Sequence, residues 1–506
     1  MNSATRVVFN TAVLYAKILV SMAIALVSVP LVLRALGASD YGLYNLVAGV
    51  VAMLNFLSNS LTTSSQRYMS VAMGTNDEKR INLIYNTSYW LHLLLGLGVV
   101  VLLECGSFFI GKLNIEPDRL WCAKIIFQFL VLSTFTKILA VPFDAIINAH
   151  EDLVTFAVIE LIDSLLMLAV AFSLKYIPTD KLIFYGLTVC LISLLTILMK
   201  YSWCRFKYKR FNINLKKYRK ELLTKEMSGF AGWNLFGGLA IIGRNQGVAI
   251  IINMFLGTIA NAAYGIANQI NGALSHFSAT FQKAINPQLM MSEGMNNRER
   301  LLRISYISSK FSVLALGFFA IPLIVEMSDV LLIWLGEDIP VYSKELSIFI
   351  LLLTIVYQYS MGIMSAVQAA GNIRNYQITM GCIILLNVPI AYVLLKYGYP
   401  VYYVTIGYVI IELISLIVRV IMADKLVQMR PTEYLKNVVY PTLMIIVPSL
   451  ALCFIPHYMI SSLWLRLIIT CFVYAVSFML LMWFVAFNRE QRDQILTRVK
   501  TNIWKR

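Results

Sequence analysis

The chain has 506 residues, of which 59% are hydrophobic and only 13% are charged, and its formal net charge is +16. About a quarter of the residues in a soluble domain are charged, so this composition excludes an ordinary soluble protein and indicates a membrane protein. The seven Cys residues are scattered without a CxxC pair, so we expect neither a disulfide framework nor a metal site, and no cofactor.

Apolar stretches of about 20 residues, long enough to cross a bilayer, recur along the whole chain. They predict an all-α, polytopic membrane protein with about fourteen transmembrane helices, of which the first is a span rather than a cleavable signal. An even number places both termini on one side. The expected spans are 10–34, 42–64, 83–110, 123–147, 153–174, 182–203, 229–256, 262–288, 305–327, 345–370, 377–395, 401–423, 438–456 and 465–487.

The distribution of basic residues predicts the orientation. With the N-terminus inside, the inner segments carry 26 of the 42 Lys and Arg residues, whereas the outer loops carry about eight. This positive-inside pattern predicts that both termini are cytoplasmic. Since topology explains most of the net charge, we expect no binding of nucleic acid, and binding of anionic lipid headgroups is secondary.

The two halves of the chain resemble each other at an offset of about 220 residues. We therefore predict two six-helix bundles, related by a pseudo-two-fold axis along the membrane normal, and two extra C-terminal helices. The matching positions are Leu36-Gly37 with Leu256-Gly257, Tyr41-Gly42 with Tyr264-Gly265, and Gly74, Asn76 and Arg80 with Gly294, Asn296 and Arg300. The expected parts are an N-terminal bundle (1–203), a basic cytoplasmic linker (204–228), a C-terminal bundle (229–424), two additional transmembrane helices (437–487) and a basic cytoplasmic tail (488–506).

Polar residues recur at helical spacing in the two spans that open each half. A polar stripe at membrane depth is costly unless it faces protein or water, so we expect these four spans to line a hydrophilic cavity. Three cations in them are candidates for holding an anionic group, although a cation near a helix end can also reach the membrane interface. The expected cavity residues are Lys17, Arg244, Lys283, Asn55, Asn59, Asn245, Asn268, Asn271 and Gln282.

Two acidic residues one helical turn apart, Glu160 and Asp163, lie in the fifth expected span. They are candidates for binding a coupling proton or Na⁺. The alternative, which we favour, is that they balance the charge of Lys124 or Lys137 or are satisfied by polar groups of the helices. The chain has no GxxxxGK[ST], HExxH or GxSxG motif, so it is not an ATPase by this criterion and we expect no catalytic residue.

Several stretches carry a resemblance to a known family. The sequence resembles the polysaccharide transport family, the O-antigen and capsule repeat-unit flippases of the multidrug/oligosaccharidyl-lipid/polysaccharide exporter superfamily. The similar stretches are LRALGASDYGLYNLVAGVVAMLNFL (33–57), SSQRYMS (64–70), GWNLFG (232–237), NAAYGIANQI (261–270), AINPQL (284–289), SSKFS (308–312) and IWLG (333–336).

The resemblance implies a flippase of the bacterial inner membrane that moves an undecaprenyl-pyrophosphate-linked glycan by alternating access. It also implies a polysaccharide polymerase and a chain-length regulator as partners. One alternative is a multidrug/cation antiporter of the same superfamily, which relies on intramembrane acids, whereas the expected cavity here is basic. A membrane polysaccharide polymerase or ligase needs large external loops with catalytic His or Arg, which the expected topology lacks.

Overall fold

The computed structural model describes residues 3–52, 55–108, 110, 115, 117–208, 222–337 and 339–486, apart from the side chains of residues 3–8, 38, 46, 50, 52, 55 and 56. Regular structure in these ranges is helical throughout. The expected tail at 488–506 and residues 209–221 of the expected linker lie outside the described residues.

The described helices fall into two groups along the chain. The first part of the chain contains α1 (Ser3–Leu36), α2 (Ala38–Ala52), α3 (Asn55–Thr75), α4 (Glu78–Ser107), η2 (Pro117–Arg119), α5 (Leu120–Ala149), α6 (Leu153–Ser173), η3 (Leu174–Tyr176) and α7 (Lys181–Tyr208). The remainder contains α9 (Thr224–Gly294), α10 (Arg298–Val325), α11 (Met327–Leu335), α12 (Ser343–Tyr359), α13 (Met361–Ala370), α14 (Arg374–Leu385), α15 (Asn387–Lys396), α16 (Tyr402–Val427), α17 (Pro431–Tyr434), η4 (Leu435–Val439), α18 (Tyr440–Met459), α19 (Leu463–Leu481) and η5 (Met482–Ala486).

These helices confirm the all-α, polytopic membrane class. Within the described residues, 11 helices are long and apolar enough to cross a membrane, or up to 12 when the bent pair α12–α13 counts as one span. Helix α9 alone runs for 71 residues and contains two of the expected spans, 229–256 and 262–288. The expected span at 42–64 covers the end of α2 and the start of α3, on either side of residues 53 and 54, which lie outside the described residues. The expected number of about fourteen is consistent with this arrangement.

The backbone repeats its unusual conformations at the offset of 220 residues. Gly37 has φ 82° and Gly257 has φ 77°, and each interrupts helical geometry at the same point of the repeat. Asn76 (φ 55°) and Asn296 (φ 53°) form a second equivalent pair, after α3 and after α9. Positive φ strains residues with a side chain, and Gly and Asn tolerate it best. The matched letters in the sequence thus correspond to matched turns.

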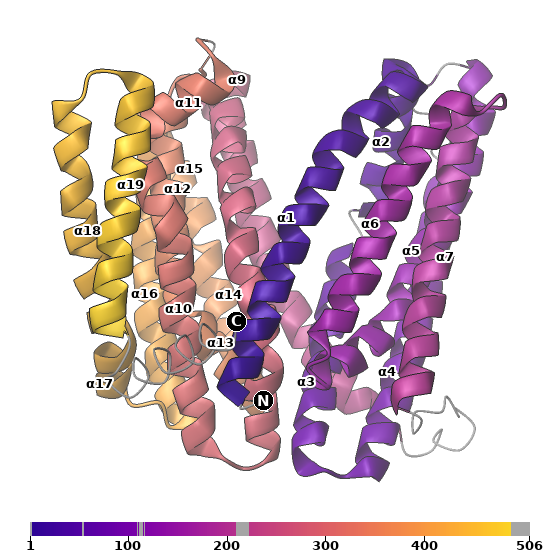
Figure 1. Cartoon of the computed structure of the whole chain (residues 1–506), viewed down its shortest axis with the longest axis horizontal. Coiled ribbons are helices and arrows are strands. Elements are labelled where there is room, and N and C mark those ends of the chain that lie inside the picture. The colour runs from indigo at the N-terminus through magenta and orange to yellow at the C-terminus, as the bar shows by residue number, and fades with distance from the viewer. Residues whose placement is uncertain are drawn as a thin grey trace, which may run out of the picture. The chain divides into compact units, whose positions relative to one another are not determined.

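Contacts divide the chain into two compact units. The first unit comprises residues 1–238 and 284–297, and the second comprises 239–283 and 298–506, so both ends of α9 belong to the first unit and its middle belongs to the second. In the first unit, α5 packs against α7, α4 and α3, and α1 packs against α6 (Figure 1).

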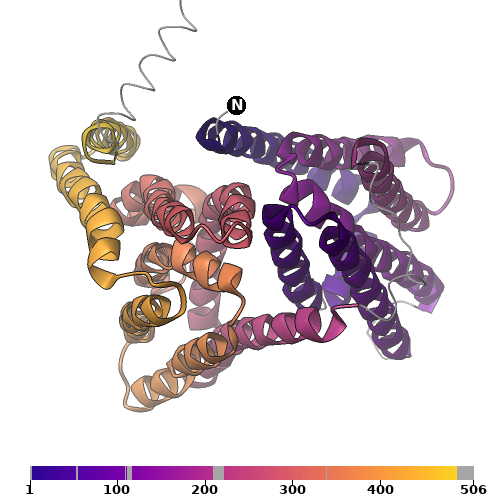
Figure 2. The same ribbon diagram turned by 90° about the horizontal axis from the view of Figure 1, so that it is seen from below.

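The second unit has its own core of packed helices. Helix α12 packs against α16, and α10 packs against α12 and α13. Helices α18 and α19 pair with each other and lie at one edge of this unit, where Figures 1 and 2 draw them in yellow. Two core clusters of buried aliphatic and aromatic side chains, one from each unit, include Ile146 and Ile147 in the first and Ile252 and Leu346 in the second.

Within the first unit, α3 crosses the last turns of α9 through two equivalent glycines, Gly74 and Gly294. A Cβ atom at Gly74 would overlap the carbonyl oxygen of Met291, and a Cβ atom at Gly294 would overlap that of Val71. Residues 71 and 291 are themselves separated by 220 positions, so the crossing is symmetric with respect to the repeat. Small residues allow two helix backbones to approach this closely.

We expect Gly294→Ala to destabilise the protein by about 1–3 kcal/mol, because the new methyl group forces the two helix backbones apart. Thermal unfolding of the purified protein in detergent measures the effect. Gly98→Ala in α4 is the matched control, since a Cβ atom there meets no atom within 4 Å. The control should be neutral or slightly stabilising. Equal unfolding temperatures for the two variants would show that the crossing relaxes without cost.

Candidate functional site: a cationic cavity in the second unit

A cavity of about 220 Å³ lies inside the second unit, between α9, α12, α14 and α16. Both halves of α9 contribute to it, since residues before and after the break at Gly257 line its walls. Its lining residues are Ile241, Arg244, Asn245, Asn271, Ser275, Leu353, Thr354, Tyr357, Ile384 and Glu412. Three of the residues expected from the sequence, Arg244, Asn245 and Asn271, therefore meet at one cavity.

Arg244 supplies a positive charge to this cavity. Its Nε donates a hydrogen bond to Oδ1 of Asn245 at 3.0 Å, and its guanidinium lies over the ring of Tyr408, 5.1 Å from the centroid. Among the described residues, no carboxylate lies within ion-pair distance of it. A guanidinium held by one amide and one aromatic face keeps its terminal N–H groups for a ligand, and these can bind a phosphate or carboxylate in bidentate fashion.

The opposite wall of the cavity carries a hydrogen-bonding group of neutral residues. Oδ1 of Asn271 accepts hydrogen bonds from Thr354 Oγ1 at 2.6 Å and from Ser275 Oγ at 3.3 Å. Both bonds end on the carbonyl oxygen of Asn271, so its NH₂ group remains a donor toward the cavity. Donors and acceptors of this kind recognise hydroxyl groups.

The carboxylate of Glu412 lines the cavity but is already neutralised. It forms an ion pair with Arg419, and both side chains are nearly completely buried, at 3% and 2% exposed. Arg419 also donates to Ser360 Oγ at 2.9 Å and lies 5.5 Å from the ring centroid of Tyr357. A buried charge is tolerated only when it is paired and hydrogen-bonded. The net charge around the cavity is therefore that of Arg244.

The first unit contains a separate charged cluster on four helices. The ammonium of Lys200 on α7 lies 2.9 Å from Asp144 Oδ1 on α5 and 3.2 Å from Glu160 Oε1 on α6. Lys17 on α1 approaches the other oxygen of Glu160 at 3.7 Å. Asp163, one turn along α6, accepts a hydrogen bond from Thr196 Oγ1 at 2.8 Å. The structure thus pairs Glu160 with two lysines.

Of the two expected acids, Glu160 is balanced by Lys17 and Lys200, whereas Asp163 accepts a hydrogen bond from the hydroxyl of Thr196. Lys124 and Lys137, which we considered as counter-charges, are both exposed, whereas the side chain of Lys200 is 6% exposed. Lys200 was not identified from the sequence, because a lysine near the inner end of an expected span resembles an interfacial anchor. Its spacing relative to α5 and α6 could not indicate the pairing, since the partners lie 56 and 40 residues away.

Two other expected cavity residues make hydrogen bonds within the protein. Asn268 donates to the carbonyl oxygen of Tyr264, one turn earlier on α9, at 2.9 Å. Gln282 is buried between α9 and α10, where it donates to Ser312 Oγ at 2.8 Å and accepts from Ser308 Oγ at 3.0 Å. Neither residue belongs to the lining of the cavity at Arg244.

The remaining expected residues are not among those that line that cavity. Asn59 on α3 is exposed, and its backbone carbonyl accepts a hydrogen bond from Thr63. Lys283 is half-buried near the end of α9. The side chain of Asn55 lies outside the described residues. Their roles as substrate contacts stay predictions.

The pKa of Asp152, a carboxyl group in a turn between two spans, is lower than its ordinary value. Asp152, in the turn between α5 and α6, accepts hydrogen bonds from Lys207 at 2.7 Å, Trp203 at 3.0 Å and Tyr208 at 2.9 Å. Burial alone would raise the pKa of this carboxyl group, but the hydrogen bonds outweigh it and hold the pKa below its ordinary value. Asp152 therefore remains a carboxylate that fastens α7 to the turn before α6.

The chain is similar to known proteins in sequence and in fold. The sequence model of the family described as "Polysaccharide biosynthesis protein" matches residues 7–295. No curated protein sequence matches the chain significantly.

Several solved structures share the fold. One is described as a MOP superfamily transporter from Pyrococcus furiosus in which the "reverse polarity of binding pocket suggests different function"; it has a TM-score of 0.72 at 14% identity and covers 85% of this chain and 96% of its own. An outward-facing multidrug resistance MATE family transporter of the MOP superfamily has a TM-score of 0.71 at 15% identity, with coverages of 85% and 96%. A MATE protein in complex with MaD3S has a TM-score of 0.72 at 15% identity, with coverages of 85% and 97%.

Proposed function

Because this chain belongs to the polysaccharide biosynthesis protein family and has the fold of MOP superfamily transporters, we propose that it is a flippase for a lipid-linked oligosaccharide. Its substrate is a polyprenyl-pyrophosphate carrying a repeat unit of O-antigen, capsule or exopolysaccharide. The protein moves it from the cytoplasmic to the periplasmic leaflet of the inner membrane. The single observation that carries this proposal is Arg244, a cation without a carboxylate partner among the described residues, in a polar cavity at membrane depth.

The chemistry of the cavity matches the parts of this substrate. The guanidinium of Arg244 suits the pyrophosphate, and the Asn271 amide with its two hydroxyl neighbours suits a sugar. A volume of about 220 Å³ is below the 300–1,000 Å³ of typical small-molecule pockets, so it holds the pyrophosphate or one sugar rather than a whole repeat unit. The polyprenyl chain can stay in the lipid.

Transport proceeds in this proposal by alternating access, with both termini in the cytoplasm. The substrate enters from the cytoplasmic leaflet, its charge is held by fixed cations, and a conformational change exposes the site to the periplasm. An ion gradient, the membrane potential or consumption of the product outside supplies the driving force. A polysaccharide polymerase and a chain-length regulator are the expected partners on the product side.

A multidrug/cation antiporter is the second candidate, because several of the solved structures that share this fold are MATE transporters. A cation antiporter uses carboxylates that can bind protons, metal ions or cationic drugs. In the second unit the cavity carboxylate, Glu412, is paired with Arg419, and in the first unit Glu160 is paired with Lys17 and Lys200. These pairings leave neither carboxylate as an open site for a cation, which argues against this candidate.

Reconstitution in liposomes tests the proposal. The probe is undecaprenyl-pyrophosphate bearing a fluorescently labelled N-acetylglucosamine, whose outer-leaflet fraction is destroyed by a membrane-impermeant quencher. Without transport, about half of the labelled lipid stays in the inner leaflet and is protected from the quencher. With the protein, we expect nearly all of the labelled lipid to become accessible to the quencher. Labelled phosphatidylethanolamine is the control for non-specific scrambling, and ethidium efflux tests the alternative. Transport of ethidium without movement of the lipid-linked sugar would overturn the proposal.

A further inference from the structure

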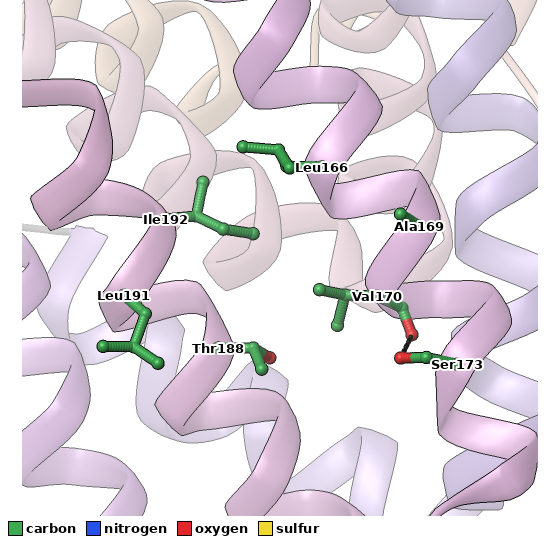
Figure 3. A pocket seen from close by; sticks show the side chains of 7 residues that line it. All are labelled: Leu166, Ala169, Val170, Ser173, Thr188, Leu191 and Ile192. Atoms are coloured by element: carbon green, nitrogen blue, oxygen red, sulfur yellow. Dashed lines mark hydrogen bonds between the residues drawn. The ribbon is translucent and has the colours of Figure 1, made fainter. Parts of the chain in front are cut away.

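A groove of about 300 Å³ lies between α6 and α7 of the first unit, and its lining includes none of the ion-paired residues described above. Figure 3 shows its side chains, which approach from the two helices across an open gap. Its outer parts are exposed, with Leu191 at 52%. The lining residues are Leu166, Ala169, Val170 and Ser173 of α6 and Thr188, Leu191 and Ile192 of α7.

The two hydroxyl groups in this lining are already used by the backbone. Ser173 Oγ donates to the carbonyl oxygen of Val170 at 2.8 Å, as Figure 3 shows, and Thr188 Oγ1 donates to that of Phe184 at 2.8 Å. Their donors point back into their own helices, so the groove presents mainly methyl and methylene groups. A sugar or peptide would lose its hydrogen bonds to water here without replacement, and this excludes a polar occupant. The groove fits a hydrocarbon chain.

The two ends of the groove differ in polarity. At one end the hydrogen bond from Thr196 to Asp163 joins α6 to α7, one helical turn beyond Leu166 and Ile192. At the other end, beyond Ser173, lie the exposed Lys175 and, at the start of α7, Lys181. Asp180, which precedes Lys181, already forms an ion pair with Arg119. The stretch from Leu166 to Ser173 spans about 10 Å at 1.5 Å per residue. The groove is thus a short apolar channel with a polar floor and a basic mouth.

We propose that this groove binds one acyl chain of an anionic phospholipid, whose headgroup lies beside Lys175 and Lys181 in the leaflet that faces the α6–α7 turn. The assignment to a phospholipid rests on charge complementarity at the mouth, because each Lys near a membrane surface favours an anionic headgroup about fivefold. The proposal does not depend on the substrate that the protein transports.

Photo-crosslinking of the full-length protein in liposomes tests this site. The probes are phosphatidylglycerol and phosphatidylcholine with a diazirine in one acyl chain, and labelled peptides are located by mass spectrometry. We expect phosphatidylglycerol to label residues 166–192 about tenfold more than phosphatidylcholine. Ala169→Trp fills the groove from α6 and should lower this labelling at least fivefold. Lys175→Gln with Lys181→Gln should remove the preference for phosphatidylglycerol.

The control is Leu198→Trp, at a lipid-exposed position of α7 outside the groove, where labelling of the groove should not change. Leu191→Trp fills the groove from the exposed side of α7 and replaces Ala169→Trp if that variant does not fold. Labelling that is equal for both probes and unchanged by a groove-filling variant overturns the proposal. A second outcome also overturns it. If unlabelled undecaprenyl phosphate reduces the labelling and unlabelled phosphatidylglycerol does not, the groove binds a polyprenyl chain instead.

Discussion

Replacing Arg244 with alanine is expected to abolish production of the surface glycan in a complementation assay while the protein stays folded in the membrane. The substitution removes the one net positive charge of the second-unit cavity, and loss of one partner of a hydrogen-bonded charge pair costs about 2–5 kcal/mol of binding. The fold loses only the bond to Asn245 and the contact with Tyr408, which contribute about 1 kcal/mol each. Complementation of a strain lacking the chromosomal copy, with membrane levels measured by immunoblot, gives the result.

Two further variants test whether the loss of function is specific to the guanidinium of Arg244. Arg244→Lys keeps the charge but cannot bind phosphate in bidentate fashion, so it should retain partial activity. Lys396→Ala removes a cation that also lies over an aromatic ring, that of Tyr392 at 5.9 Å, but is exposed and does not line the cavity. It should complement fully. Normal glycan from cells that carry Arg244→Ala would exclude a cationic binding site in this cavity.

Lys17, unlike Arg244, has a carboxylate partner among the described residues. Its ammonium lies 3.7 Å from Glu160, a distance longer than that of a strong charge-assisted hydrogen bond. In the proposed transport, an anionic substrate would bind Lys17 in exchange for Glu160, its present partner. Lys200 holds the other oxygen of Glu160 at 3.2 Å, so the carboxylate keeps one partner when Lys17 is occupied. This arrangement makes Lys17 a conditional contact, whereas Arg244 is available in the structure as it stands.

Local features of the sequence predicted the fold well. Apolar length determines where a helix can cross the bilayer, and the positive φ angles at Gly37 and Gly257 occur where the repeat predicted equivalent turns. Helical spacing also led us to expect Arg244, Asn245 and Asn271 at a cavity, and they line one, but its other walls come from α12, α14 and α16 rather than from the first two spans. Their role as substrate contacts stays a prediction.

Partners across helices could not be predicted in this way. Gln282 lies on the same polar stripe as Asn271, yet it faces α10 and bonds to Ser308 and Ser312. Periodicity indicates which residues share a face but not which helix packs against it. The pairing of Glu160 with Lys200 depends likewise on the packing of α6 against α7, and a single sequence contains no record of that contact.

The ion pair between Glu412 and Arg419 carries the largest expected effect on stability. We expect Glu412→Gln to destabilise the protein by about 3–5 kcal/mol, because Arg419 is then left charged in an interior where it is 2% exposed. Its remaining partners, Ser360 and the ring of Tyr357, cannot neutralise it. Thermal or denaturant unfolding of the purified protein in detergent measures the loss. Glu299→Gln, at the exposed start of α10, is the matched control and should cost less than about 1 kcal/mol.

The double variant Glu412→Leu with Arg419→Met separates the structural role of the pair from a role in transport. Replacing both buried charges with apolar residues of similar size is often neutral for stability, so this variant should regain most of what Glu412→Gln loses. If this variant folds and still restores the surface glycan, the pair, which lies within α16, serves only to neutralise two buried charges, and Arg244 provides the cavity's charge for the substrate. A double variant as unstable as Glu412→Gln would contradict this account, since the cost would then not come from the uncompensated charge of Arg419.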